Sequence, residues 1–178
     1  MTVDLNKMGQ AAREASRQLA LLGEQKKNQV LETVAQELLA KADEIIAANK
    51  VDLENATNMP EKFIDRLKID NDRIAAMAEG VRQVAQLADP IGKIDAGWVN
   101  YAGLQIEKKR VPLGVVGMIF EARPNVTVDA SALCFKSGNA VILRGGKEAL
   151  QTNIKITKVI RQALEQEGIN PEIGRAHV

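Results

Sequence analysis

The chain contains a single cysteine, Cys134, among its 178 residues. One thiol can form neither an internal disulfide nor a cysteine-based zinc cluster. We expect no metal site in the chain. The scarcity of cysteine also favours the cytoplasm over an oxidising compartment. Cys134 stands in an apolar segment with helical spacing, and such surroundings raise the pKa of a thiol and hide its sulfur. We therefore predict a structural role for Cys134 and not a nucleophilic one.

The sequence also lacks any excess of charge and any long apolar run. Its 24 Lys and Arg residues balance 23 Asp and Glu residues, for a net charge of +1, which gives no electrostatic reason to expect a nucleic-acid partner. No segment approaches the roughly 18 apolar residues of a membrane span, and the first ten residues lack the pattern of a signal peptide. Aromatic residues make up only 3% of the chain, so its core must be aliphatic and rich in alanine.

Residues 1–92 are predicted to form an N-terminal helical segment. Apolar side chains recur at helical spacing in two stretches, and the second stretch stops at Asp89-Pro90. Asp70 or Asn71 can cap the helix that contains this second stretch. We expect the two stripes to face a core. Their members are Leu31, Val34, Ala35, Leu38 and Leu39, then Ile74, Met77, Ala78, Val81, Val84, Ala85 and Ala88.

The pattern changes to an extended one over residues 93–111. Strand-forming residues lie on both sides of a turn-like segment that ends at Gly103, so a β-hairpin is the simplest interpretation. Trp98 and Tyr101 lie near its tip. An exposed edge with aromatic residues is suited to contact with a partner.

Residues 112–178 are predicted to form a βαβα unit of an α/β fold. The apolar runs 114–119 and 140–143 suit strands that are buried on both faces of a parallel sheet. Residues 124–137 between them read as a right-handed crossover helix, with Pro124 at its start and Gly138 as its C-terminal cap. Its apolar stripe is predicted to contain Val126, Ala130, Leu133 and Cys134, and a second amphipathic helix is expected over residues 147–166.

Two loops follow the predicted strands, where open parallel sheets bind ligands. Glu121, Arg123 and Asn125 occupy the first loop and suit an oxygen-rich or anionic ligand. The second loop, residues 144–148, contains paired glycines that allow a ligand close to the backbone, with flanking cations for ribose or phosphate oxygens. Two plainer interpretations stay open. The first loop would hold only a surface Arg–Glu pair that caps a helix, and the second only an ordinary turn.

Residues 111–149, VPLGVVGMIFEARPNVTVDASALCFKSGNAVILRGGKEA, resemble the γ-glutamyl phosphate reductase family, also called glutamate-5-semialdehyde dehydrogenases, within the aldehyde dehydrogenase superfamily. Residues 73–94, RIAAMAEGVRQVAQLADPIGKI, and residues 61–70, EKFIDRLKID, agree with it. The resemblance implies the first half of a Rossmann-like cofactor domain after the helical layer and the hairpin. It also implies that the hairpin reaches a partner subunit in a homo-oligomer.

The resemblance implies a reaction as well. Members of this family use NADPH to reduce L-glutamate 5-phosphate to the semialdehyde in proline biosynthesis, through a cysteine thiolate that attacks the acyl carbon. That cysteine lies beyond position 178 in a full-length member, so we expect this chain alone to be inactive and to bind NADPH weakly. The last five residues, 174–178, do not resemble the family, in which a further strand follows.

The resemblance also implies roles for individual residues. Asn125 lies near the place of an asparagine whose amide stabilises the oxyanion, although EARPN departs from the superfamily's proline-tryptophan-asparagine motif. Residues 144–147, which are Arg144, Gly145, Gly146 and Lys147, match a segment that contacts the adenosine ribose. Glu121 and Arg123 are candidates near the nicotinamide or the substrate. Two alternative functions remain: a non-enzymatic fragment that associates through its hairpin or open sheet edge, and a small nucleotide- or phosphate-binding module.

Overall fold

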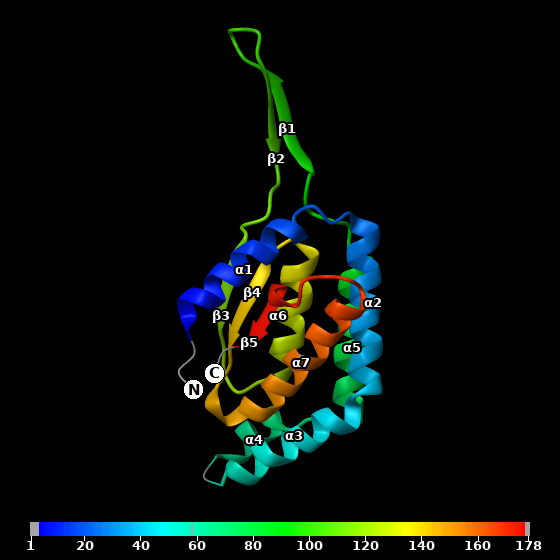
Figure 1. The fold of residues 1–178 in the computed structure, drawn as a ribbon, viewed down its shortest axis with the longest axis vertical. Coiled ribbons are helices and arrows are strands. Elements are labelled where there is room, and N and C mark those ends of the chain that lie inside the picture. The colour runs from blue at the N-terminus through cyan, green and yellow to red at the C-terminus, as the bar shows by residue number, and fades with distance from the viewer. Residues whose placement is uncertain (1–3, 58, 177–178) are drawn as a thin grey trace.

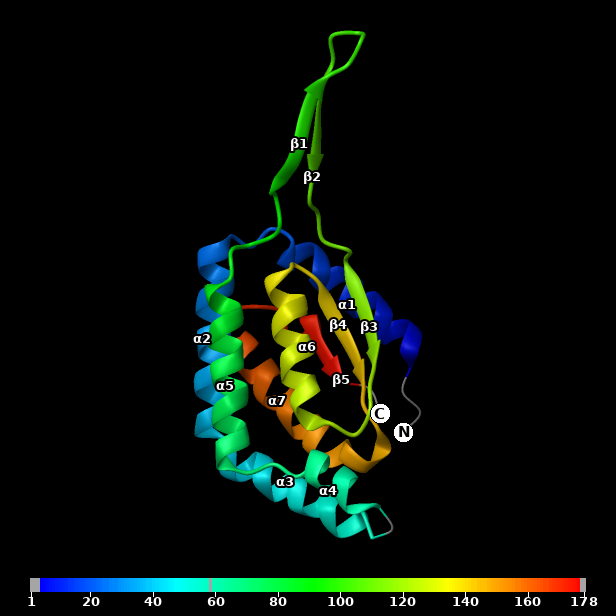
Figure 2. The same cartoon turned by 180° about the vertical axis from the view of Figure 1, so that it is seen from behind.

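The structure, a computed structural model, describes residues 4–57 and 59–176. Helices cover a small parallel sheet, and a two-stranded arm projects from one end of this body (Figures 1 and 2). Within the described residues, no helix is long and apolar enough to cross a lipid bilayer. The helices are α1 (Leu5–Leu19), α2 (Glu24–Ala40), α3 (Ala42–Asn55), α4 (Glu61–Leu67), α5 (Asn71–Gln86), α6 (Pro124–Lys136) and α7 (Leu150–Gln166), with short 3-10 turns at Lys147–Ala149 and Pro171–Ile173. The strands are β1 (Ile94–Val99), β2 (Gln105–Lys109), β3 (Val115–Ile119), β4 (Ala140–Arg144) and β5 (Gly174–Ala176).

The N-terminal helices form as predicted. Asp70 caps α5, because its side chain accepts a hydrogen bond from the Arg73 N–H at 2.9 Å. Helix α5 ends at Gln86, just before Asp89-Pro90, so Ala88 lies beyond the helix and is exposed, and its assignment to the apolar stripe was wrong. The stripe of α2 is buried except for Leu39, which is 41% exposed, so its assignment to the core was wrong. One core joins these helices to α6 and α7, and its members include Val30, Leu38, Ile74, Val81, Phe135, Ile156 and Leu164.

The parallel sheet has the strand order β3-β4-β5. The prediction of strands buried on both faces is confirmed for β4 but wrong for β3, where Ile119 is 79% exposed. The reason is that β3 is an edge strand, paired on one side only. The βαβα prediction also missed β5, which pairs in parallel with β4 from Gly174 onward. The last two residues, 177–178, lie outside the described residues.

Helix α6 is the crossover helix between β3 and β4, and Gly138 follows it with a φ of +75°. Its predicted apolar stripe was partly wrong, because Leu133 is 53% exposed. The helix instead has two buried faces. Ala130 and Cys134 pack with side chains of the sheet, whereas the face with Val128, Ala132 and Phe135 joins the helical core. A single stripe cannot describe a helix that lies between two layers.

The arm is the predicted hairpin. Strands β1 and β2 pair antiparallel with Trp98 opposite Ile106, and the Asn100 N–H donates to the Leu104 carbonyl at 3.0 Å across the turn. All of β1 is exposed, and Tyr101 at the tip is fully exposed. The hairpin stands clear of the body in both views (Figures 1 and 2).

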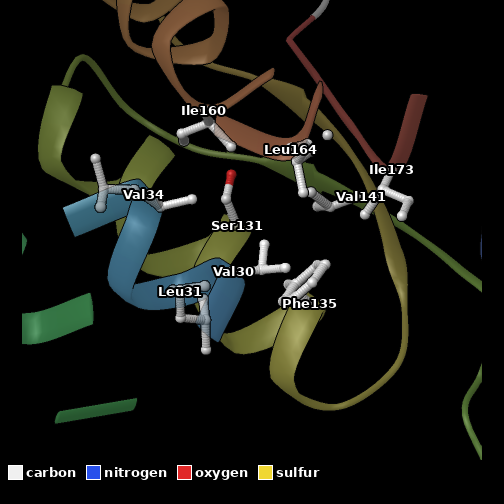
Figure 3. Close-up of a pocket in the computed structure, with 12 residues that line it drawn as sticks. Val30, Leu31, Val34, Ser131, Phe135, Val141, Ile160, Leu164 and Ile173 are labelled. Atoms are coloured by element: carbon white, nitrogen blue, oxygen red, sulfur yellow. The ribbon is translucent and has the colours of Figure 1, made fainter. Parts of the chain in front are cut away.

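A small apolar cavity of about 20 Å³ lies in the core between α2, α6, α7 and the sheet (Figure 3). The Ser131 hydroxyl is its polar group in the close-up, and it already donates to the Thr127 carbonyl at 2.7 Å. A space of this size holds about one water molecule. The cavity is therefore a packing feature and not a ligand site.

Candidate active site

The two predicted loops meet at the carboxyl ends of β3 and β4. The Phe120 N–H donates to the Arg144 carbonyl at 3.0 Å and so joins the loops at their first residues. Further on, a Cβ atom added to Gly146 would lie 2.9 Å from the Ala122 nitrogen. The loops therefore form one continuous surface at the sheet end where ligands of open α/β folds bind.

Both glycines of the second loop are required by packing. A Cβ atom at Gly145 would lie 2.2 Å from Nδ2 of Asn153 and 3.2 Å from the Phe120 ring. Asn153 is buried and held in place, because its Oδ1 accepts from the Thr127 hydroxyl at 2.9 Å. Protein atoms thus occupy the space beside each glycine. The expectation that the glycines admit a ligand to the backbone stays a prediction.

The two cations of this loop are available to a ligand. Arg144 and Lys147 are exposed, and among residues 4–57 and 59–176 neither side chain has a carboxylate or hydrogen-bond partner. Free cations beside an exposed loop suit phosphate and ribose oxygens. The residues present at the end of β4 therefore fit the phosphate-bearing part of a dinucleotide.

The start of α7 is not available to an anion, although it follows the same loop. Asp52 of α3 reaches it, and its carboxylate accepts from the Gln151 N–H at 3.0 Å, the Thr152 N–H at 2.8 Å and the Thr152 hydroxyl at 2.6 Å. Asp52 is itself buried. A carboxylate already satisfies these helix N-terminal donors, so a phosphate would depend on the Arg144 and Lys147 side chains.

The first loop carries a cluster of three charges. Glu121 lies 3.3 Å from Nε of Arg123 and 3.7 Å from Nη1 of Arg66, which comes from α4. The Arg–Glu pair of the plainer interpretation is thus present, but no side chain caps α6. The cluster forms part of a depression of about 360 Å³, together with Gly146 and Glu148 of the second loop. The structure therefore brings Glu121, Arg123 and Gly146 to one place.

Asn125 follows the charged residues of the first loop and lies on the first turn of α6. It is exposed, and its amide donates to Oδ2 of Asp129 at 3.3 Å. Burial raises the pKa of the Asp129 carboxyl, and the Asn125 hydrogen bond opposes this only in part. A primary amide has two N–H donors, so one remains for a ligand. Asn125, Arg123 and Asp129 line a second depression of about 440 Å³.

Cys134 takes no part in this surface. Its side chain is buried in a cluster with Ala130, Val141 and Leu143, and burial raises the pKa of its thiol. The neutral form is therefore favoured, which is the opposite of what a nucleophile needs. The position agrees with the structural role predicted for this residue.

Sequence reasoning missed Arg66, Asp129 and Asp52. Arg66 and Asp52 come from helices far earlier in the sequence than the loops, α4 and α3, and no local motif marks them. Asp129 had a weak signal, since it stands one helical turn after Asn125 and residues four apart share a helix face.

Comparison with known proteins identifies the family. Residues 2–173 match the model of the aldehyde dehydrogenase family. The chain is 99% identical over 172 residues to a γ-glutamyl phosphate reductase of Ligilactobacillus salivarius, and 60% identical over 168 residues to that of Lactiplantibacillus plantarum. The match covers 97% and 94% of this chain but only 41% and 40% of those relatives.

Solved structures agree with this result. The γ-glutamyl phosphate reductase of Thermotoga maritima superposes with a TM-score of 0.94 at 36% identity, over 98% of this chain and 43% of that one. The enzyme of Saccharomyces cerevisiae superposes with a TM-score of 0.91 at 30% identity, over 99% of this chain and 47% of that one. The chain thus belongs to the aldehyde dehydrogenase family and is similar to about the first two fifths of its γ-glutamyl phosphate reductases.

Proposed function

We propose that this chain supplies the N-terminal part of an NADPH-dependent reductase that converts L-glutamate 5-phosphate to L-glutamate 5-semialdehyde in proline biosynthesis, in the cytoplasm. The 99% identity to a γ-glutamyl phosphate reductase over 172 residues carries this proposal, since the match includes both loops. Membership of the aldehyde dehydrogenase family implies a nicotinamide cofactor. The free cations Arg144 and Lys147 support NADPH in particular, because its additional phosphate needs positive charge.

Each predicted site residue has a place in this proposal. Arg144 and Lys147, with the backbone of Gly145 and Gly146, hold the adenosine ribose and its phosphate. When bound, NADPH supplies the hydride. The charges of Glu121 and Arg123 lie toward the nicotinamide or the substrate, and the second N–H of Asn125 donates to the oxyanion that forms at the acyl carbon.

We propose that the 178 residues alone do not catalyse this reduction. The reaction needs a thiolate, and the single thiol of the chain, Cys134, is buried in an apolar cluster. The test is to incubate the purified chain with NADPH and L-glutamate 5-phosphate and to follow the loss of NADPH absorbance, with the Ligilactobacillus salivarius relative as the positive control. We expect turnover by the relative only. Turnover by the chain itself would contradict the proposal.

We propose three functional regions, residues 1–92, 93–111 and 112–178. The first and third share one hydrophobic core, so they would be regions of a single folded unit. The hairpin of residues 93–111 has no such contacts along its length and would serve as the oligomerisation arm of a homo-oligomer.

A second candidate function is association without catalysis, and the exposed hairpin favours it. Trp98, Val99, Tyr101 and Leu104 are all more than half exposed there, and exposed apolar side chains beside a free strand edge promote association. Sedimentation of the chain with and without the full-length relative would detect it. The double variant W98E/L104E is expected to reduce association, whereas E107Q on the same hairpin serves as a control that leaves its apolar side chains in place.

A third candidate is a small nucleotide- or phosphate-binding module that uses residues 144–148. Equilibrium titration with NADPH tests it directly. We expect weak binding, because one loop and its two cations provide only one side of a dinucleotide site. Tight binding that is lost in R144Q/K147Q would favour this candidate over the first.

A further inference from the structure

The depression beside Asn125 has charges of both signs that lack partners. It lies where the end of α4, the start of α5 and the start of α6 meet, and Figure 2 shows these three segments at the end of the molecule opposite the hairpin. Its volume of about 440 Å³ falls in the usual range of small-molecule sites, about 300 to 1,000 Å³. The depression is lined by Asp65, Arg66, Lys68, Arg73, Arg123, Asn125 and Asp129 together with three apolar side chains.

The negative charge of interest is Asp129 on α6. Among residues 4–57 and 59–176 no cation lies within salt-bridge distance of its carboxylate, and its hydrogen-bond partner is the neutral amide of Asn125. The Asp129 side chain lines the depression and is exposed, so its carboxylate is accessible to a ligand and has no compensating charge beside it in the described part of the chain. A positively charged ligand group would supply that compensation.

The positive charges come from the α4 side of the same depression. The Lys68 ammonium has no hydrogen-bond or carboxylate partner in the described part of the chain, and the nearest carboxylate of Arg66 is Glu121 at 3.7 Å. Arg73 is different, since its guanidinium is held by Asp65 at 2.9 Å and by the Lys68 carbonyl at 2.7 Å. Lys68 is therefore the unpaired cation available to an anionic ligand group, and Arg66, which already pairs with Glu121, is a second cation beside it.

From this arrangement we propose that the depression binds the α-amino acid end of the substrate, with Asp129 on the ammonium group and Lys68 and Arg66 on the α-carboxylate. An α-amino acid presents one positive and one negative group on the same carbon, which matches a site with unpaired charges of both signs. Asn125 then lies between this end and the reacting acyl group. The inference deepens the proposed function and rests on it.

The test uses the Ligilactobacillus salivarius relative with substitutions at matching positions. The assay runs in the reverse direction, in which the aldehyde, phosphate and NADP⁺ give the acyl phosphate, NADPH and a proton. Two aldehydes are compared: L-glutamate 5-semialdehyde, and 5-oxopentanoate, which lacks the ammonium group. D129N is the informative variant, because the asparagine oxygen can still accept from Asn125 while the charge is lost. Glu79→Gln, an exposed residue of α5 outside the depression, is the matched control.

We expect D129N to raise the KM for L-glutamate 5-semialdehyde about tenfold, the size of one charge-assisted hydrogen bond, with little change in kcat. The KM for 5-oxopentanoate should stay the same in D129N, and both KM values should stay the same in E79Q. A merely structural role of Asp129 would raise both KM values together, and this result would overturn the inference.

A second measurement does not depend on a variant. L-glutamate should inhibit the unsubstituted enzyme more strongly than glutarate, in competition with the aldehyde, and D129N should remove that difference. Equal inhibition by the two compounds would overturn the assignment of the ammonium group. An unsubstituted enzyme without activity on L-glutamate 5-semialdehyde would instead overturn the proposed function.

Discussion

At the scale of single residues, two glycines determine how closely the loops after β3 and β4 approach each other. The space beside Gly145 is filled by Asn153 and Phe120, and the space beside Gly146 by backbone atoms of Ala122. Glycine is needed here because any side chain would push the loops apart, and neither residue has a positive φ.

We therefore predict that Gly145→Ala lowers the free energy of unfolding by about 1 to 3 kcal/mol, the usual cost of overpacking. Urea denaturation of the chain measures this change. Gly117→Ala is the matched control, because an added Cβ meets no atom within 4 Å at that strand position. Equal stability of G145A and the unsubstituted chain would contradict the close packing of the loops.

A second prediction at this scale concerns the thiol of Cys134. Burial raises its pKa in the folded state, so the folded chain holds the thiol proton more tightly than the unfolded chain does. The resulting stability is present below the unfolded pKa, at about 8.5, and is lost as the pH rises through the folded pKa. Labelling with a thiol reagent should be slow in buffer and fast in urea. Rapid labelling of the folded chain would show that the thiol is accessible.

Predictions about single residues were correct where the deciding interactions lie within a few residues along the sequence. The apolar neighbours of Cys134 predicted its burial, and Asp70 caps α5 because a cap needs only the next three residues. Asp129 and Arg66 escaped prediction, since their importance comes from the meeting of α4, α5 and α6 in space. A charge pattern that is assembled from three helices has no counterpart along the chain.

At the scale of elements, α7 depends on α3 for its first turn. The Asp52 carboxylate takes up the Gln151 and Thr152 N–H groups and the Thr152 hydroxyl. Next to it, the Asn49 amide donates to the Leu67 carbonyl at 2.9 Å and to the Thr152 hydroxyl at 3.1 Å. The cap thus also ties the end of α4 to the helix that follows the glycine loop.

We predict that Asp52→Ala destabilises the chain by about 2 to 3 kcal/mol, because a buried helix start loses its acceptor. Asp52→Asn should cost less, since its remaining oxygen still accepts. Glu54→Ala, which removes an exposed carboxylate from the same helix, is expected to change the urea midpoint little. Equal midpoints for D52A and E54A would show that the cap contributes nothing.

The positions of the helices and strands were predicted better than the burial of their side chains. Hydrophobic period and turn residues correctly located α2, α5, α6 and α7, the hairpin and the strands β3 and β4. They did not separate α1, α2 and α3, which were predicted only as part of the helical segment 1–92. Burial of β3 was predicted wrongly because an apolar run does not tell an edge strand from a central one. Leu133 was misplaced for a related reason, since α6 packs on two sides and its exposed strip is narrow.

At the scale of the whole molecule, the base of the hairpin is anchored by a buried ion pair. Lys27 of α2 is 1% exposed and lies 2.7 Å from the Asp89 carboxylate, just before the hairpin begins. Lys136, also buried, donates to the Ala85 carbonyl at 2.9 Å. Burial alone would raise the pKa of Asp89, but hydrogen bonds from Lys27 and the Ile91 N–H, with the nearby lysine charges, hold that pKa below its usual value.

We predict that this pair makes the fold sensitive to acid. A carboxyl with a lowered folded pKa stabilises the fold above its unfolded value, about 3.9, and this stability is lost as the pH falls through the folded pKa. Asp89→Asn should cost about 3 kcal/mol near neutral pH, because Lys27 then stays buried without a counter-charge. The difference from the unsubstituted chain should shrink on acidification, as urea midpoints over a pH series would show.

The control for this prediction is Asp95→Asn. Asp95 also has a lowered pKa, caused first by its hydrogen bond from Arg110, but this pair lies exposed on the hairpin. Solvent screens such pairs, so D95N should shift the urea midpoint far less than D89N. Similar shifts for both variants would mean that burial of Lys27 does not matter.

The strand order of the parallel sheet has a final consequence. The sheet extends from β3 through β4 to β5 in one direction, so any strand added on the other side must join the free edge of β3. In doubly wound folds, successive strands are added first on one side of the initial strand and then on the other. A crevice lies at the carboxyl ends of the strands where this order reverses. Glu121 and Arg123 follow β3 at that point, and they would line such a crevice from one side.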